Sequence, residues 1–235
     1  MTILAMDTSA KAASVCLASE DKIIGEFFIK TSLTHSQTLV PMVEQLCKQS
    51  DVPMENIEAV AINAGPGSFT GVRIGVAAAK GIAFQQNLPC VSVSTLESMA
   101  YNMLGSDCVV CALMDARCSQ VYNAMFRVKR ESVERLCDDR AVSMTDLKLD
   151  LQKYTDKVVF VGDGAHIAFK SLENSLENVF LAPMIRITQT AASVACAAFK
   201  QINEGNTLTP AELMPVYLRL PQAQRELNKK LGVTK

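Results

Sequence analysis

The sequence contains 235 residues, of which 49% are hydrophobic, and its formal net charge is −1. This length allows one large domain or two small ones, and the near-neutral charge excludes a global attraction to nucleic acid or to an anionic membrane. The chain begins without a basic amino-terminal region or cleavage site, and charged residues interrupt its longest apolar stretches. We therefore expect a cytoplasmic protein that makes no membrane contact.

Three β-strands are predicted first, at residues 2–6, 14–18 and 23–29. The first strand ends at Asp7-Thr8-Ser9, so it delivers an acidic residue and two hydroxyls into a loop. From residue 34 the apolar positions recur at helical spacing, and Pro41 must either start or kink this helix. Two strand–helix pairs are predicted next, at residues 59–85 and 89–104.

The strand–turn–helix stretch of residues 59–85 allows three interpretations. The backbone N–H groups of its glycine turn could hold a phosphate or another anion at the helix start. The small side formed by Gly71, Gly75 and Ala78 could instead let a second helix approach closely. The simplest interpretation is that the glycines only satisfy the backbone geometry of the connection. The turn has no Gly-Lys-Ser/Thr ending, so the structural interpretation is favoured from this stretch alone.

Eight cysteines occur at positions 16, 47, 90, 108, 111, 118, 137 and 196, mostly inside apolar runs. Such positions are typical of small buried side chains in a reducing compartment, and we expect no disulfide bonds. Cys108 and Cys111 have the CxxC spacing, but residues i and i+3 of a strand point to opposite faces. No second CxxC or histidine pair completes a zinc site, so a pair of strand cysteines is favoured.

The second half of the chain repeats the order of the first. A strand at residues 108–114 ends at Asp115, as the first strand ends at Asp7, and a strand at residues 158–161 runs into Gly162-Asp163-Gly164. The remaining elements are a hairpin at residues 121–127 and 132–136 and helices at 145–154, 166–172 and 190–203. This order predicts an α/β fold of two duplicated domains, each βββαβαβα, covering residues 1–104 and 105–235.

The predicted topology, with its paired acidic loops, resembles the actin, sugar-kinase and Hsp70 group of ATPases (ASKHA), whose domains are RNase H-like. Five segments are more specific: AMDTS (Ala5–Ser9), THSQTLVPMV (Thr34–Val43), INAGPGSFTGVRIG (Ile62–Gly75), MDAR (Met114–Arg117) and PVYLR (Pro215–Arg219). Together they resemble the TsaB family, also called YeaZ, of bacterial tRNA threonylcarbamoyladenosine synthesis. The resemblance covers nearly the whole chain.

The resemblance implies a scaffold subunit with no catalytic residues of its own. The resemblance implies that this subunit pairs with TsaD, its catalytic paralogue. Together with the ATPase TsaE, the pair would modify the tRNA adenosine beside the anticodon. It would meet tRNA only through the complex. The alternative functions are an actin-like-fold ATPase or small-molecule kinase.

A metalloprotease is not expected, because the sequence lacks a plausible metal site. TsaD-type enzymes carry a metal-binding His-x-x-x-His on the first helix, whereas here His35 is followed four residues later by Leu39. The only other histidine is His166. Two such histidines without a nearby carboxylate cluster make a poor site for zinc or iron, so we predict no bound metal.

The resemblance also implies a vestigial nucleotide site. Asp7 and Asp115 occupy the places where ATPases of this fold hold magnesium and phosphates, but the loop after Asp7 has no glycine and no residue is an evident base. The residues expected at this site are Asp7, Thr8, Ser9, Asp115, Gly162, Asp163 and Gly164. We expect no obligatory cofactor, with ATP or ADP bound only in the complex.

A partner interface is predicted on the helix that follows the glycine turn, because this helix carries more apolar and small surface than one core-facing stripe requires. The helix of residues 39–47 is its predicted neighbour, and two such helices from each protomer would pack together. The expected interface residues are Leu39, Val43, Gly71, Val72, Gly75, Val76, Ala78, Ala79 and Ile82. This surface would bind TsaD, or form a homodimer in its absence. The alternative is that both stripes belong to the internal core.

The tail from Tyr217 to Lys235 is basic, with Glu226 as its only acidic residue. A solvated terminus is the favoured interpretation, and a contact with tRNA in the assembled complex comes second.

Overall fold

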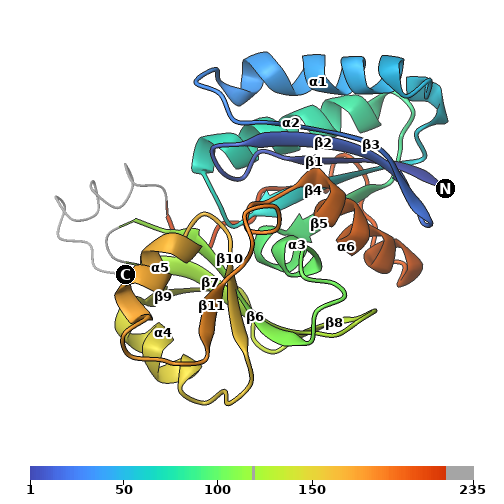
Figure 1. Ribbon diagram of the computed structural model, residues 1–235. Helices are drawn as coiled ribbons and strands as arrows, with labels where there is room; N and C mark the ends of the chain where they lie inside the picture. The colour runs from blue at the N-terminus through green and yellow to red at the C-terminus, as the bar shows by residue number, and fades with distance from the viewer. Residues whose placement is uncertain (118–119, 221–235) are drawn as a thin grey trace, which may run out of the picture.

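The computed structural model describes residues 1–117 and 120–220 and consists of two α/β halves (Figure 1). The first half contains β1 (Thr2–Asp7), β2 (Ala13–Ser19), β3 (Lys22–Ile29), α1 (His35–Gln49), the 3₁₀ turn η1 (Met54–Asn56), β4 (Ala59–Gly65), α2 (Phe69–Phe84), β5 (Cys90–Ser94) and α3 (Thr95–Tyr101). Every element predicted for this half is present, and Pro41 lies inside α1.

The second half contains β6 (Cys108–Asp115), β7 (Gln120–Val128), β8 (Val133–Arg135), β9 (Arg140–Ser143), α4 (Met144–Leu151), β10 (Val158–Val161), α5 (Ala165–Leu172), β11 (Val179–Leu181) and α6 (Ala191–Asn203). Two short strands, β9 and β11, are absent from the predicted elements. A strand of three or four residues is too short to show a clear alternation of apolar and polar positions.

The two sheets have the same strand order, which confirms the predicted duplication. The first sheet runs β3-β2-β1-β4-β5 and the second β8-β7-β6-β10-β11, with β9 also paired to β7. In each half the first two strands are antiparallel, and three strands pair in parallel: β1, β4 and β5 in the first half, and β6, β10 and β11 in the second. The carboxyl ends of β1 and β4 therefore lie at one edge of the first sheet, and those of β6 and β10 at one edge of the second.

Helices cover both faces of the first sheet. Leu4 and Met6 of β1 pack in one core cluster with α1 and α2, whereas Ile3 and Ala5 pack in another with α6. This alternation follows from the strand geometry, in which successive side chains point to opposite faces. Because both faces are covered, β1 reads as a continuous apolar run.

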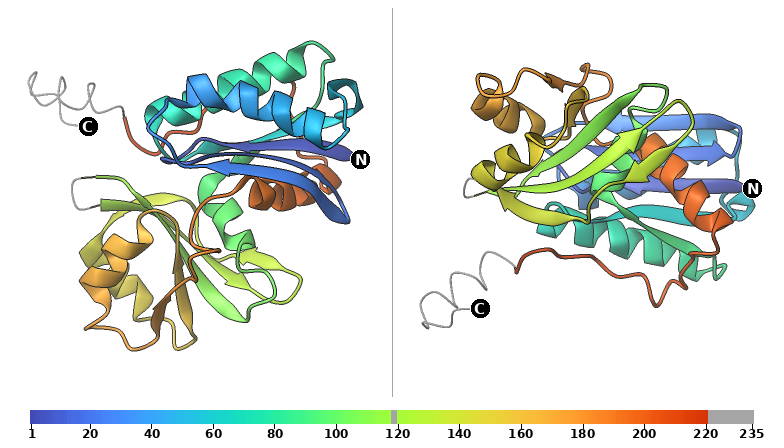
Figure 2. Two further views of the ribbon diagram at one scale, coloured as in Figure 1. Left: turned by 45° about the horizontal axis from the view of Figure 1, so that its top comes forward. Right: turned by 90° about the horizontal axis from the view of Figure 1, so that it is seen from below.

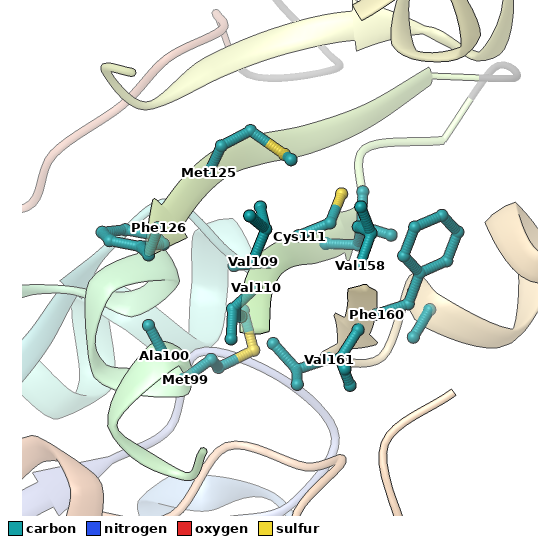
Figure 3. Close-up of a cluster of buried hydrophobic side chains, with 14 of the residues drawn as sticks. Met99, Ala100, Val109, Val110, Cys111, Met125, Phe126, Val158, Phe160 and Val161 are labelled. Atoms are coloured by element: carbon teal, nitrogen blue, oxygen red, sulfur yellow. The ribbon is translucent and has the colours of Figure 1, made fainter. Parts of the chain in front are cut away.

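The helices α3 and α6 are exchanged between the halves. Leu96, Met99 and Ala100 of α3 belong to the core cluster of the second sheet, and Figure 3 shows Met99 beside Val110 and Val161. In return, α6 from the second half covers the first sheet, and both helices lie between the two sheets in Figure 1. The expected boundary after residue 104 separates the two sheets in sequence, but it does not separate their cores.

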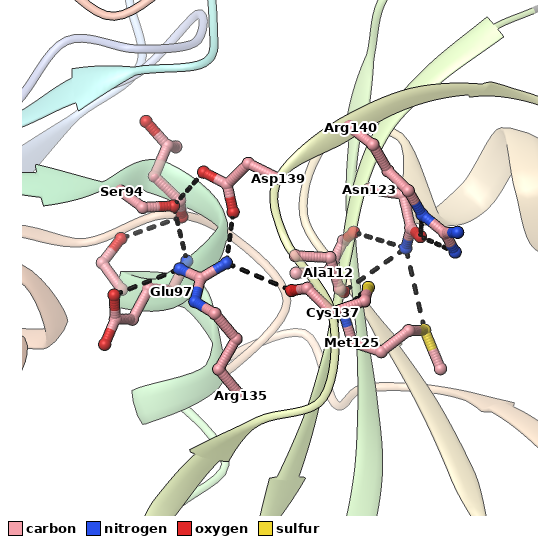
Figure 4. Close-up of polar contacts among 12 residues, drawn as sticks. Ser94, Glu97, Ala112, Asn123, Met125, Arg135, Cys137, Asp139 and Arg140 are labelled. Carbon is pink, nitrogen blue, oxygen red and sulfur yellow. Dashed lines mark hydrogen bonds and ion pairs between the residues drawn. The ribbon is translucent and has the colours of Figure 1, made fainter. Parts of the chain in front are cut away.

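Polar contacts fix the start of α3 to the second sheet (Figure 4). Arg135 of β8 places Nη1 2.6 Å from Asp139 Oδ1 and Nη2 3.2 Å from Glu97 Oε2 of α3. Ser94, the N-cap of α3, donates to Asp139, and the Arg135 guanidinium lies 4.8 Å from the centre of the Phe126 ring. One arginine thus joins the two halves at this helix.

After α6 the chain returns to the first half as a C-terminal strap, residues 206–220, which runs alongside α2 (Figure 2, right). Leu208 pairs with Cys90 at the start of β5, and Leu213 is fully buried in the core beneath α1 and α2. Further along, the Val216 N–H donates to the Ala64 carbonyl at 2.7 Å, and Arg219 Nη1 donates to the Ala116 carbonyl at 2.8 Å. The strap therefore links the end of β4 to the end of β6.

Candidate functional site: an interdomain cleft and a helical face

A cleft of about 530 Å³ lies where the two halves meet. Its walls come from the loop after β1, the turn before α2, the end of β6 and residues 216–220 of the strap. Lys11, Arg117 and Arg219 contribute cationic groups, and Asp115 and Asp163 contribute carboxylates. Of the residues expected at a nucleotide site, Ser9, Asp115 and Asp163 line this cleft.

Asp7 does not reach the cleft, because its side chain is buried in the first half with 1% of its surface exposed. Its Oδ1 accepts hydrogen bonds from the Ser9 N–H at 3.2 Å, Ser9 Oγ at 2.7 Å and Asn63 Nδ2 at 2.8 Å. Burial raises the pKa of Asp7 above its ordinary value, and these hydrogen bonds oppose the shift. An enclosed carboxyl group of this kind is poorly placed to bind a magnesium ion in the cleft.

The glycines of α2 explain why this loop is closed. Thr8 is fully buried, and its Oγ1 donates to the Gly71 carbonyl at 2.8 Å. A Cβ atom on Gly71 would lie 2.1 Å from the Thr8 carbonyl oxygen, and one on Gly75 would lie 2.3 Å from Thr8 Oγ1. The small side of α2 therefore packs on the loop after β1, where an ATPase of this fold would hold phosphates. Gly71 and Gly75 thus allow a close approach within the chain, a packing role that none of the three interpretations of residues 59–85 specifies.

The corresponding part of the second half is more open. Asp115 is exposed, and its Oδ1 accepts a hydrogen bond from the Arg117 N–H at 2.7 Å. Gly162 has a φ of +102°, and a Cβ there would lie 2.0 Å from the Leu113 carbonyl oxygen, so this turn requires glycine. Asp163 reaches solvent, yet desolvation by the surrounding protein, together with the charge of Asp115, raises its pKa. The predicted site is thus divided into one closed and one open half.

His35 lies at the start of α1, where Thr34 and Gln37 form a capping box. The His35 Nε2 atom is hydrogen-bonded to the Ala10 carbonyl at 2.9 Å, so the ring packs against the loop after β1. Within residues 1–117 and 120–220, no group of three or more His, Cys, Asp or Glu side chains is arranged to hold a metal ion. The seven described cysteines are free thiols, and Cys118 lies outside the described residues.

The predicted partner interface needs a correction. Helices α1 and α2 do lie side by side on the outer face of the first half (Figure 1), but most of the residues chosen face inward. The buried residues are Leu39, Val43, Gly71, Val72, Gly75, Val76 and Ala79. The five larger residues belong to the core between these helices and the sheet, whereas the two glycines pack on the loop after β1. Ala78 and Ile82 remain half-exposed.

The exposed side of α2 consists of Thr70, Arg73, Ala77, Gly81 and Phe84, which we call the docking stripe. These residues recur at helical spacing, so they share one face. Phe84 is 79% exposed, and the half-buried residues Ala78 and Ile82 flank this stripe and pack against the edge of the core. An exposed aromatic ring on a largely small and apolar helix face is typical of a protein-binding surface.

Sequence reasoning missed a cluster beside the docking stripe. Tyr217 of the strap stacks on Phe69 at 4.7 Å between ring centres, and its hydroxyl accepts a hydrogen bond from Arg73 Nε at 2.7 Å. The Arg73 guanidinium carbon lies 3.8 Å from the centre of the Phe69 ring. The signal was available, since these residues come from the two segments Ile62–Gly75 and Pro215–Arg219.

The predicted tRNA contact of the basic tail falls mainly on residues 221–235, which lie outside the described residues.

Comparisons with known proteins agree over most of the chain. A family model described as TsaD, tRNA N6-adenosine threonylcarbamoyltransferase, matches residues 29–226. The chain is 31% identical to the tRNA threonylcarbamoyladenosine biosynthesis protein TsaB of Bacillus subtilis, covering 95% of this chain and 96% of that protein. It is 32% identical to the Escherichia coli protein of the same name, over 97% and 98% of the two chains.

Solved structures give the same assignment of the fold. YeaZ from Pseudomonas aeruginosa superposes with a TM-score of 0.79 at 26% identity, covering 92% of this chain and 99% of that one. An activator of 2-hydroxyisocaproyl-CoA dehydratase from Clostridium difficile, at 9% identity and a TM-score of 0.52 over 87% and 97% of the two chains, shares the fold alone. The fold is the predicted actin-like ATPase fold. No described helix is both long and apolar enough to cross a membrane.

Proposed function

Because the chain belongs to the TsaB family of tRNA threonylcarbamoyladenosine biosynthesis proteins, we propose that it is the non-catalytic subunit that supports a TsaD-type transferase. The observation that carries this proposal is the closure of the loop after β1. Asp7 and Thr8 are buried there, so the loop after β1 is not open to a phosphate, as it would need to be in an independent ATPase or kinase.

The proposed partners are a TsaD-type subunit, bound as a heterodimer, and the ATPase TsaE. The docking stripe, the half-buried Ala78 and Ile82, and the adjoining outer side of α1 form the surface proposed for the heterodimer. The same surface serves a homodimer when the chain is alone. The open half of the cleft, with Asp115 and Asp163, is proposed to contact ATP or ADP only within the cytoplasmic complex, and tRNA is reached through the partners.

The test is a reconstitution with purified TsaD, TsaE, tRNA and the activated threonylcarbamoyl donor. Modified adenosine is expected to form when this chain is added and to fall to background when it is omitted. The chain alone is expected to hydrolyse ATP no faster than a buffer control. Turnover of ATP by the chain alone at an ordinary enzymatic rate, abolished by Asp115→Ala, would favour the ATPase or kinase alternative.

The surface is tested by Ala78→Glu, which places a carboxylate on the partly exposed flank of α2, at the edge of the core. This variant is expected to stay folded and to lose co-purification with the TsaD-type subunit. Ser171→Glu, on the exposed side of α5, adds the same charge in the other half and is expected to bind normally. Equal binding by the two variants would rule out the α1–α2 surface. Gly75→Arg is unsuitable here, because Gly75 packs against Thr8.

A further inference from the structure

Two separate segments of the chain hold one exposed guanidinium group in place. Phe69 supplies an aromatic face at 3.8 Å, and the Tyr217 hydroxyl takes the single N–H of Arg73 Nε at 2.7 Å. Tyr217 is itself held by its stacking on Phe69 and by the adjacent hydrogen bond from the Val216 N–H to the Ala64 carbonyl. The side chain of Arg73 is therefore fixed before any partner arrives, which lowers the entropic cost of binding through it.

The contacts that fix Arg73 leave its outer edge available. One face of the Arg73 guanidinium lies on the Phe69 ring, and its Nε donates to Tyr217. None of the ion pairs between described residues involves Arg73. The two terminal nitrogens present N–H groups in one plane, which is the arrangement that binds a carboxylate through two parallel hydrogen bonds. Holding the strap would need only the aromatic stack and the Nε contact, so it does not account for an exposed terminal fork.

The surroundings of Arg73 favour an anionic group carried on an apolar surface. Helix α2 contains no acidic residue, and its two charged residues are Arg73 and Lys80. Lys80 already donates to the Ala211 carbonyl of the strap at 3.1 Å. Arg73 is then the cation of the docking stripe, flanked by Phe69, Tyr217 and Ala77. A complementary surface would place one carboxylate among apolar side chains.

We propose that Arg73 is a preorganised carboxylate-binding group, and that the transferase subunit inserts an acidic side chain between its terminal nitrogens when it docks on α2. This inference rests on the proposed function, which supplies the partner. Arginine is enriched among the few residues that dominate interface affinity. The strap thereby acts in docking indirectly, since its Tyr217 positions Arg73.

The test compares the affinities of purified variants for the transferase subunit by titration calorimetry at two salt concentrations. Arg73→Gln is expected to weaken binding by about tenfold or more and to reduce its salt dependence. Arg73→Lys keeps the charge but loses the planar fork, and is expected to weaken binding by about fivefold or more. Lys80→Gln removes the same charge from the same helix and is expected to stay within about twofold of wild type, because its contact is internal.

Tyr217→Phe keeps the stack on Phe69 but removes the acceptor for Nε. It is expected to weaken binding by about two- to fivefold while the melting temperature stays close to that of wild type. This variant guards against a loss of binding caused by unfolding of the strap.

The partner residue is found by replacing each exposed Asp or Glu of the transferase subunit with its amide. One such variant is expected to weaken binding to wild type as much as Arg73→Gln does, and to have no further effect in the Arg73→Gln background. The inference would be overturned if Arg73→Gln bound with wild-type affinity, or if Arg73→Gln and Lys80→Gln lost affinity equally. It would also be overturned if the effect of every carboxylate replacement on affinity were additive with that of Arg73→Gln. Failure of the wild-type chain to bind the subunit would instead overturn the proposed function, and this inference with it.

Discussion

Asp7 is predicted from the sequence to belong to a vestigial nucleotide site, yet its surroundings are those of a core residue. Its carboxyl group is enclosed between β1 and the start of α2, and it receives hydrogen bonds from Ser9 and Asn63. The sequence could place Asp7 at the end of a strand, because the apolar run before it is unambiguous. It could not show that Gly71 and Gly75 allow α2 to cover the loop, since this depends on a contact between segments more than sixty residues apart.

The pKa of Asp7 gives a prediction of pH dependence. Burial raises this pKa above 3.8, so the folded state holds the proton more tightly than the unfolded state does. The resulting stabilisation is fully present below the unfolded pKa and is lost as the pH rises through the folded pKa. Asp7→Asn keeps the shape without the charge, and is therefore expected to raise the melting temperature near neutral pH.

The measurement is thermal unfolding of wild type and Asp7→Asn at about pH 8 and about pH 4, and the gain should shrink at the lower pH. Ser9→Ala removes the Oγ donor to the ionised carboxyl group and keeps the backbone N–H donor, so it is expected to lower stability mainly at the higher pH. A difference between wild type and Asp7→Asn that does not change with pH would contradict this account of the site.

Helix α2 combines three tasks on three sides. Its apolar stripe fills the core, its small side lies on the loop after β1, and its docking stripe faces solvent. Helical periodicity in the sequence identified the core-facing stripe and the presence of a second, small stripe. From the sequence, that second stripe was predicted to bind a partner. A glycine on an exposed helix surface and a glycine beneath a neighbouring loop give the same pattern in sequence, so the two cases could not be told apart.

Two glycines of α2 provide a matched pair for testing this division. A Cβ on Gly71 would lie 2.1 Å from a backbone oxygen, whereas one on Gly81 would meet no atom within 4 Å. Gly71→Ala is expected to lower the free energy of unfolding by about 1–3 kcal/mol through overpacking. Gly81→Ala is expected to raise it by about 0.5–1 kcal/mol, because alanine favours the helix. Urea unfolding measures both, and a destabilised Gly81→Ala together with a neutral Gly71→Ala would refute the packing described.

At the scale of the whole molecule, the strand order of the two sheets was predictable from the sequence. Which helix covers which sheet was not. The strand order of both sheets follows the predicted βββαβαβα pattern, since it depends on local elements and short connections. The exchange of α3 and α6 could not be read from the chain, because an apolar helix face does not specify which of two apolar sheets it covers. The part of the cleft wall formed by residues 216–220 was missed because it depends on a contact between segments that are far apart in the sequence.

The exchange predicts that neither half folds alone. A fragment of residues 1–104 lacks α6, so one face of its sheet would expose Ile3, Ala5 and Val91 to water. This fragment is expected to show no cooperative thermal transition, whereas mixing it with residues 105–235 should restore one. Heteronuclear NMR spectra of the fragment and of the mixture check this, and a well-dispersed spectrum from residues 1–104 alone would show that α6 is dispensable.

The exchange also has a consequence for synthesis on the ribosome. The first sheet is complete once β5 has emerged, but the helix that covers its second face ends at Asn203 and is made roughly a hundred residues later. Because synthesis adds about 5–20 residues per second, this apolar face of the sheet stays exposed for several seconds. A small chain collapses much faster than that. During that interval the nascent chain would be a substrate for chaperones that bind exposed apolar strands, and rare codons between β5 and α6 would lengthen it.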